Sequence, residues 1–359
     1  MKMLRLYIGC MLLMMVSCKE EIIYDLSGGK PILFSQSMGV ESYSDSRTRT
    51  ASPAPASGSL TSLNGQSFGV RGFIYDGNWL EAEAMAKPDP TWQNVEVRCD
   101  ASGICDYTTN QLKVQTWEPK KNYAFFGYYP YGITGVTLSS HNDYKSPILQ
   151  YNLSDKAVGN AGNGWKGNAS AMYDVMYGSV IDANELKSTT VELPFKHALF
   201  GAQVVIENFG DQPVVIEGLS IELGLKYRGI DIPMNGAPVK LKPFSEPVDK
   251  PNIQKVSFEY IKQGTDPAVT VNSTLNLQPI DVSKGKHLLL IPQKGMSLTA
   301  TVQVQGKKDP HIIKQDFPNS DLQAGIRYVF DIQFIGEDIN LIIIEGTQWD
   351  PKDNNIEFE

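Results

Sequence analysis

Apolar and polar residues alternate along several stretches of this 359-residue chain, a pattern that favours strands over helices. In residues 297–305, aliphatic side chains alternate with serine, threonine and glutamine, and residues 197–207 and 326–334 show a similar two-residue period. Successive side chains of a β-strand point to opposite faces, whereas a helix needs a period of about 3.6 residues, which is almost absent here. The chain is therefore predicted to be all-β, with antiparallel sheets that keep one face in water.

The length of the chain and the spacing of these runs predict two domains. A domain typically holds about 150 residues, and strand-length runs recur with turn residues between them from Phe68 onward. Residues 41–67 are rich in serine, proline and glycine and are predicted to be a loop. We expect two β-sandwich domains in series, residues 68–193 and 194–359, the first completed by a strand at about residues 30–36.

Charge and composition exclude several classes of function. The chain has 32 lysines and arginines against 40 acidic residues, a net charge of −8, and shows no basic cluster. Such a protein is a poor electrostatic partner for nucleic acid. The four histidines are far apart, and no hydrolase, phosphate-loop or zinc motif occurs. We therefore expect no catalytic residue, no metal site and no cofactor.

Residues 1–17 have the features of a lipoprotein signal peptide. Two basic residues precede the uncharged apolar residues 6–16, a run too short to span a bilayer. The run ends at Cys18 and resembles a lipobox, whose cysteine is acylated and becomes the first residue. Residues 19–21 resemble the lysine-plus-acidic tag that directs lipoproteins to the outer face of the outer membrane. We expect a surface protein anchored through Cys18, with residues 18–67 forming the tether, the first strand and the loop.

Cys99 and Cys105 are the cysteines that remain beside Cys18 once Cys10 leaves with the signal peptide. The residues between them include aspartate, serine and glycine and separate two extended runs, which predicts a hairpin turn. Outside the cytoplasm a disulfide is favoured over metal binding, and no histidine lies nearby to complete a zinc site. The sequence therefore predicts a disulfide across this turn.

Short, mostly apolar motifs occur in a fixed order along nearly the whole chain. They are the lipobox at Cys18 and residues 32–35, 48–50, 68–70, 123–130, 173–177, 193–199, 289–293, 324–330 and 346–349. In this order they resemble the fimbrillin family of Bacteroidales, the lipoprotein precursors of fimbrial subunits. The resemblance implies two transthyretin-like antiparallel β-sandwich domains, in agreement with the strand pattern.

The same resemblance implies assembly by exchange of β-strands. In the family, a protease cuts after an arginine near the end of the first strand, and a strand from another subunit fills the groove that is left. Here the removable strand would contain Ile32, Leu33 and Phe34, and the cut would follow Arg47 or Arg49 in an accessible loop. An interpretation of both arginines as ordinary solvated charges stays open.

The strand donated to another subunit should come from the C-terminus. Ile356 and Phe358 alternate with glutamates there, but the run is only about four residues long, whereas strands average about five to six. The tail is thus either a donated strand or part of its own second domain. Whether the protein is a repeating, a tip or an anchor subunit stays open.

Two classes of function compete. The leading hypothesis is a structural or adhesive fimbrial subunit, with other fimbrial subunits and a host or bacterial surface ligand as partners. The alternative is a surface glycan-binding lipoprotein of a nutrient-uptake system. A glycan binder should expose several tryptophans on one face, whereas a fimbrillin should bury them. The tryptophans are Trp79, Trp92, Trp117, Trp165 and Trp349.

Overall fold

The computed structural model describes most of the chain from residue 29 to residue 348. The described ranges are residues 29–38, 63–82, 87–108, 113–139, 146–159, 166–234, 236, 238–244, 253–272, 280–282, 288–336 and 338–348. Within them, the helices are short, and they include α1 (Trp79–Ala82), α2 (Asp155–Val158) and the 3₁₀ turn η4 (Ala169–Ala171). No helix in these ranges is long and apolar enough to cross a membrane. The prediction of an all-β protein is confirmed.

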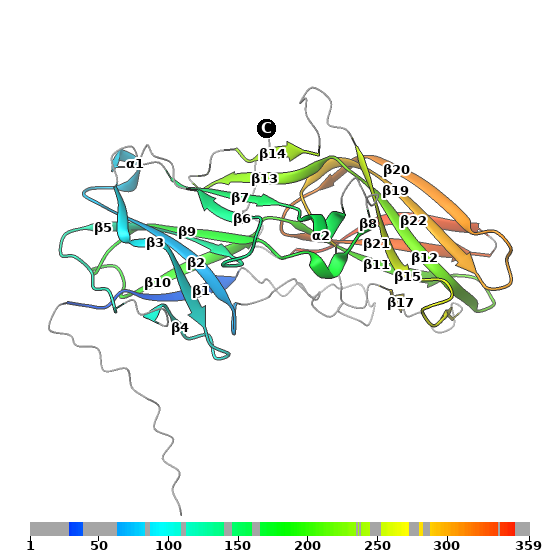
Figure 1. Ribbon diagram of the computed structural model, residues 1–359, viewed down its shortest axis with the longest axis horizontal. Coiled ribbons are helices and arrows are strands. Elements are labelled where there is room, and N and C mark those ends of the chain that lie inside the picture. The colour runs from blue at the N-terminus through cyan, green and yellow to red at the C-terminus, as the bar shows by residue number, and fades with distance from the viewer. Residues whose placement is uncertain are drawn as a thin grey trace, which may run out of the picture.

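The N-terminal part of the described chain forms a closed barrel (Figure 1, blue to green). The strands, in their order around the barrel, are β1 (Leu33–Met38), β10 (Thr190–His197), β9 (Met176–Ala183), β5 (Asn122–Tyr129), β2 (Ser67–Tyr75), β3 (Lys87–Cys99) and β4 (Cys105–Asp106). Most neighbours are antiparallel, but β1 runs parallel to β10. Closure gives every strand two neighbours, although β1 meets β4 at a single residue pair and β10 meets β9 at two.

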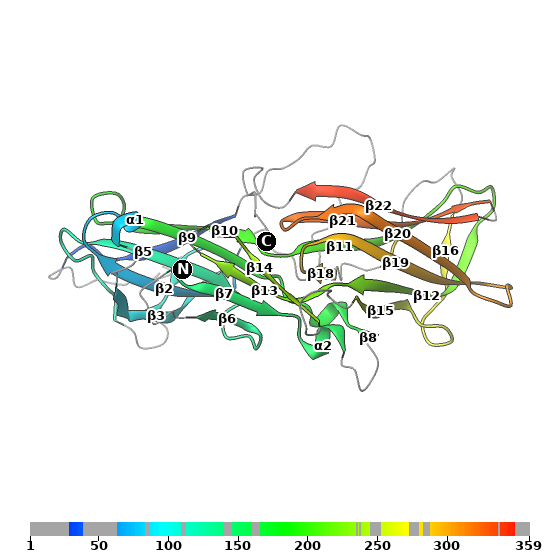
Figure 2. The same ribbon diagram turned by 90° about the horizontal axis from the view of Figure 1, so that it is seen from above.

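Two larger sheets make up the other end of the molecule (Figure 2). The first contains β17 (Ile280–Asp281), β11 (Phe200–Asn208), β21 (Ile326–Ile335) and β22 (Asp338–Gln348), with β18 (Leu288–Leu290) also on β11. The second contains β20 (His311–Leu322), β19 (Gln293–Val304), β12 (Val214–Leu225), β15 (Gln254–Ile261) and β8 (Lys166–Gly167), with β16 (Val269–Val271) also on β12. Apolar side chains of both sheets belong to one buried cluster.

The alternation of apolar and polar residues predicted the burial pattern of β19 well and that of β11 less well. In β19, Leu298, Ala300 and Val302 are buried while the residues between them are partly exposed, as a half-wet sheet requires. Every residue of β11 is buried, including Gln203 and Glu207. β11 is an interior strand, with β21 along one side and β17 and β18 along the other, so its side chains have neighbours on both sides within the sheet.

A small sheet joins strands from the two halves of the sequence. It contains β14 (Lys240–Pro243), β13 (Tyr227–Pro233), β7 (Ile148–Asn152) and β6 (Val136–Ser139), which lie in the middle of the molecule (Figure 1). The pairing of β7 with β13 and of β8 with β15 crosses residue 194, and β10 continues through Pro194. The division into domains at residues 68–193 and 194–359 stays a prediction.

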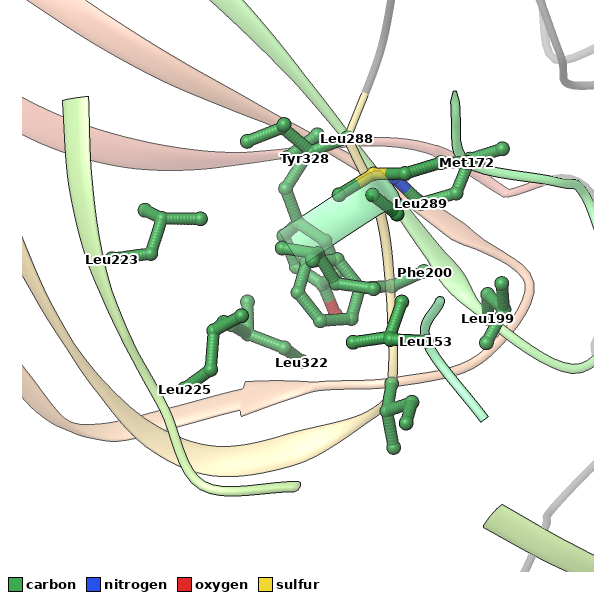
Figure 3. Packing of buried hydrophobic residues seen from close by; sticks show 14 of the residues in the cluster. Leu153, Met172, Leu199, Phe200, Leu223, Leu225, Leu288, Leu289, Leu322 and Tyr328 are labelled. Atoms are coloured by element: carbon green, nitrogen blue, oxygen red, sulfur yellow. The ribbon is translucent and has the colours of Figure 1, made fainter. Parts of the chain in front are cut away.

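The buried side chains form two clusters. The larger one extends from the second half of the chain into the first (Figure 3). In it, the sulfur of Met172 accepts a hydrogen bond of 3.2 Å from the Leu289 N–H, and the rings of Phe200 and Tyr328 meet edge to face at 5.7 Å. The smaller cluster fills the barrel and includes Ile32, just before β1. The barrel thus has a core of its own, to which the N-terminal strand contributes.

Candidate functional site

The candidate site is the position of β1 in the barrel. β1 pairs with β10 in parallel from Leu33 opposite Thr190 to Met38 opposite Phe195. On its other side, Phe34 lies opposite Cys105 of β4 in an antiparallel pair. Removal of β1 would therefore open the ring between β10 and β4 and leave two rows of unpaired backbone groups.

Two side chains anchor this segment in the barrel core. Ile32 and Phe34 are 1% and 4% exposed, whereas Leu33 between them is only half-buried. The Phe34 ring meets the rings of Trp92, Tyr107 and Phe125 edge to face, with centroids 5.3, 5.9 and 5.2 Å away. Edge-to-face pairs add about 0.5–1.5 kcal/mol each beyond the burial of area, so Phe34 is the principal anchor.

The wall of the site opposite β10 consists of two short pieces of chain rather than one long strand. The first piece is β4, and the second contains Gln115, whose carbonyl accepts a hydrogen bond of 2.8 Å from the Ile32 N–H. Tyr107 connects the two pieces. Its hydroxyl donates to the Ile32 carbonyl at 2.9 Å and accepts from the Gln115 N–H at 2.9 Å. The Tyr107 hydroxyl thus bonds both to the N-terminal segment, at Ile32, and to the second piece of the wall, at Gln115.

The turn that precedes β4 is covalently closed. Cys99 of β3 and Cys105 of β4 lie opposite each other and are joined as a disulfide. Inside the turn, the Asp100 carboxylate accepts hydrogen bonds of 2.8 and 2.9 Å from the N–H groups of Ser102 and Ile104. These bonds, with that from the Ser102 hydroxyl as the largest cause, lower the pKa of Asp100.

The sequence-predicted residues fall partly within this site. Ile32 and Phe34 point into the barrel, and Leu33 lies on the outer side of the same strand. The strand expected at residues 30–36 is observed as Leu33–Met38. Just before it, Lys30 and Ile32 make backbone hydrogen bonds to residues 115–117. The remaining predicted residues lie outside the described residues; they are Cys18, Arg47, Arg49, Ile356 and Phe358.

Sequence reasoning missed the residues that receive β1. Trp92, Tyr107 and Phe125 come from three separate segments, and Gln115 lies in no strand. The three aromatic residues are visible in the sequence, but their convergence on Phe34 depends on closure of the barrel. No spacing along the chain encodes that closure.

The described tryptophans are buried. Trp79, Trp92 and Trp117 are 3%, 1% and 2% exposed, and Trp165 and Trp349 lie outside the described residues. Three buried rings offer no platform for stacking a sugar. This observation weighs against the glycan-binding alternative.

His197, at the end of β10, has a structural partner. Its Nδ1 lies 2.8 Å from the Asp174 carboxylate, and both side chains are almost fully buried. Burial lowers the pKa of Arg327 on β21, and the Asp174 charge opposes that shift. Asp174 therefore interacts both with His197 of the barrel and with Arg327 at the other end of the molecule. In the described ranges, no group of three His, Cys, Asp or Glu side chains could hold a metal ion.

The chain is thus an all-β protein whose first described strand completes a barrel. A model of the fimbrillin-like family matches residues 77–349, which is most of the chain. The chain belongs to the fimbrillin-like family, as the order of its motifs predicted.

Two solved structures share the fold over nearly their whole length. A fimbrial protein from Bacteroides vulgatus superposes with a TM-score of 0.54 at 14% identity, over 89% of this chain and 99% of that protein. A candidate cell adhesion protein from Bacteroides ovatus gives a TM-score of 0.50 at 14% identity, over 90% of this chain and 98% of that one. No curated protein sequence matches the chain.

Proposed function

We propose that the protein is a structural or adhesive subunit of a bacterial surface fimbria that assembles by exchange of β-strands. The observation that carries the proposal is the position of β1, which is the first described strand and closes the barrel between β10 and β4. Membership of the fimbrillin-like family supports it, as does the shared fold with a fimbrial protein and a candidate adhesion protein.

Loss of β1 would create a defined acceptor groove. β10 would offer unpaired backbone groups along residues 190–195, and the pockets of Ile32 and Phe34 would be empty. Exposure of these apolar pockets to water is unfavourable, and an incoming strand would fill them while restoring the backbone hydrogen bonds. The groove therefore selects a strand that carries two large apolar side chains two residues apart.

The C-terminal sequence contains such a pair. Ile356 and Phe358 repeat the spacing and the residue types of Ile32 and Phe34, with Glu357 in the place of Leu33. Leu33 is the half-buried residue of the three, so a glutamate at this position can stay in contact with water. We assign Ile356 and Phe358 as donor residues for the groove of another copy.

Export and anchoring complete the proposal. The precursor is a lipoprotein, with a signal peptide at residues 1–17, acylated at Cys18 and held on the outer membrane at the cell surface. Cleavage after Arg47 or Arg49 separates β1 from the rest of the subunit and places the processed chain in the fimbria. We also propose that each end of the molecule is a transthyretin-like sandwich domain, the N-terminal one with its strands closed into the barrel.

One experiment tests assembly. Residues 19–359 are purified, treated with an arginine-specific protease and followed by size at several concentrations. A single cut near Arg49 followed by concentration-dependent ladders is expected, and a variant with Arg47→Gln and Arg49→Gln should stay intact. Ladders indicate a repeating subunit, whereas a product that stops at two copies indicates a tip or anchor. A cut product that stays monomeric contradicts the proposal.

A further inference from the structure

We infer that the Cys99–Cys105 disulfide positions the wall of the acceptor groove, so that β4 stays in place when β1 has left. This inference rests on the proposed strand exchange. It assigns the disulfide a role in accepting a strand, separate from its contribution to the stability of the intact precursor.

β4 is too short to hold its place unaided. It consists of Cys105 and Asp106, and its strand partners are β1 and the end of β3. When β1 leaves, two backbone pairs with β3 remain, Arg98 with Asp106 and Cys99 with Cys105. Two pairs are far fewer than the number in a typical strand, which is about five to six residues long.

The wall formed by β10 is held by its side chains. Apart from β1 it also has only two backbone pairs, both with β9, but it is eight residues long and buries Val191, Leu193 and Phe195 in the barrel core. The Phe195 ring meets the ring of Phe68 on β2 edge to face at 5.1 Å, a contact that does not involve β1, so this wall should persist in the open groove. The two walls thus differ in stability, and the disulfide lies on the weaker one.

The position of β4 determines the shape of the Phe34 pocket. Cys105 lies directly opposite Phe34, and Tyr107 follows only two residues later. The Tyr107 ring contacts the Phe34 ring, and its hydroxyl binds the Ile32 carbonyl. If β4 moved away from β3, Tyr107 would move with it, and both the anchor pocket and the backbone contact would be lost. The disulfide prevents that movement by fixing the backbone of Cys105 beside that of Cys99.

Loss of the disulfide should have different effects in the closed and the open barrel. In the intact precursor, β1 itself holds β4 through the Phe34–Cys105 pair, so loss of the disulfide should have a modest effect. In the open barrel this support is gone, and loss of the disulfide should strongly reduce the binding of a new strand. Such non-additivity between neighbouring elements is the expected sign of coupling.

The test measures binding of a strand to the open groove. Residues 19–359 are prepared with a site for a sequence-specific protease in place of residues 46–50, so the test does not depend on natural processing. After cleavage and removal of the N-terminal fragment, a fluorescent peptide of residues 30–38 is titrated into the protein. The double variant Cys99→Ser/Cys105→Ser is compared with the wild type, and Ile104→Ala in the same turn is the matched control, because Ile104 is 64% exposed.

We expect the wild type and Ile104→Ala to bind the peptide equally, and the double variant to bind at least tenfold more weakly. Equal binding by the double variant would overturn the inference. Failure of the wild type to bind would instead contradict the proposed strand exchange, so the two failures are distinguishable. If the double variant does not fold, the same comparison is made on cleaved wild-type protein before and after reduction by a thiol, where unchanged binding again overturns the inference.

Discussion

The Tyr107 hydroxyl donates a hydrogen bond of 2.9 Å to the Ile32 carbonyl and holds the N-terminal segment against the barrel wall. Tyr107→Phe should destabilise the precursor by about 1–3 kcal/mol, because the buried Ile32 carbonyl and the Gln115 N–H both lose this partner. Denaturant unfolding measures the change. Tyr173→Phe is the control, since Tyr173 is exposed and should tolerate the change. Equal stability of the two variants would contradict this role.

Phe34 should be the most sensitive residue of β1. Phe34→Ala removes a buried ring that contacts three aromatic neighbours, and a phenylalanine-to-alanine change in a core costs about 3–5 kcal/mol. Thermal or denaturant unfolding gives the loss. Ser35→Ala, one residue further along the same strand and only partly buried, should change stability by less than about 0.5 kcal/mol. A small effect of Phe34→Ala would mean that β1 is not anchored as described.

The buried pair of His197 and Asp174 should be essential for the packing of the barrel end. His197→Ala removes a hydrogen-bond partner 2.8 Å away from an almost fully buried carboxyl group, and loss of one partner of a buried polar group costs about 1–3 kcal/mol. Unfolding curves check this value. His311→Ala is the matched control, because His311 is only partly buried at the start of β20. Similar losses for both histidines would argue against a special role for the pair.

Stability should fall at alkaline pH. Burial raises the pKa of Tyr128 to about 12 and that of Tyr129 to about 12, above the ordinary value of 10.0. A group whose pKa is higher in the folded state stabilises the fold fully below its unfolded pKa and loses that contribution as the pH rises. The free energy of unfolding should therefore decrease between pH 10 and pH 12, by up to about 1.4 kcal/mol per pH unit and group. Tyr128→Phe should reduce this slope, and an unchanged slope would contradict the assignment.

Lipid anchoring through Cys18 has its own test. Cys18→Ala should release the protein from the membrane fraction of cells, because the acylated residue is lost. Cys10→Ala, inside the signal peptide, should leave the distribution unchanged. Continued membrane association of Cys18→Ala would rule out the lipoprotein proposal without affecting the strand-exchange groove.

Local patterns in the sequence predicted local structure well. The alternation in residues 297–305 predicted β19 and its buried face, and the motif around Ile32 predicted a strand close to β1. The turn between Cys99 and Cys105 was predicted from its composition. Each of these features depends on neighbours within a few residues along the chain, so a single sequence carries the information.

Features that depend on distant contacts could not be predicted. β7 pairs with β13, which lies far along the chain, and nothing in either strand specifies its partner. β11 shows the same alternation as β19 but is buried on both faces, because its neighbours in the sheet and the layers around it decide its exposure. The contacts of Phe34 with Trp92, Tyr107 and Phe125 could not be predicted either, since these rings come together only when the barrel closes.

Cross-linking between copies tests the central claim most directly. If Ile356 and Phe358 replace Ile32 and Phe34, then Glu357 takes the place of Leu33 beside Thr190. Residues 19–359 with Thr190→Cys and Glu357→Cys should then form disulfide-linked dimers and ladders after β1 is cut and removed, and none before. The Leu33→Cys/Thr190→Cys variant is the positive control and should cross-link within one uncut chain, because these residues are paired in the precursor. Absence of intermolecular cross-links after cleavage, while the control cross-links, would contradict assembly by strand exchange.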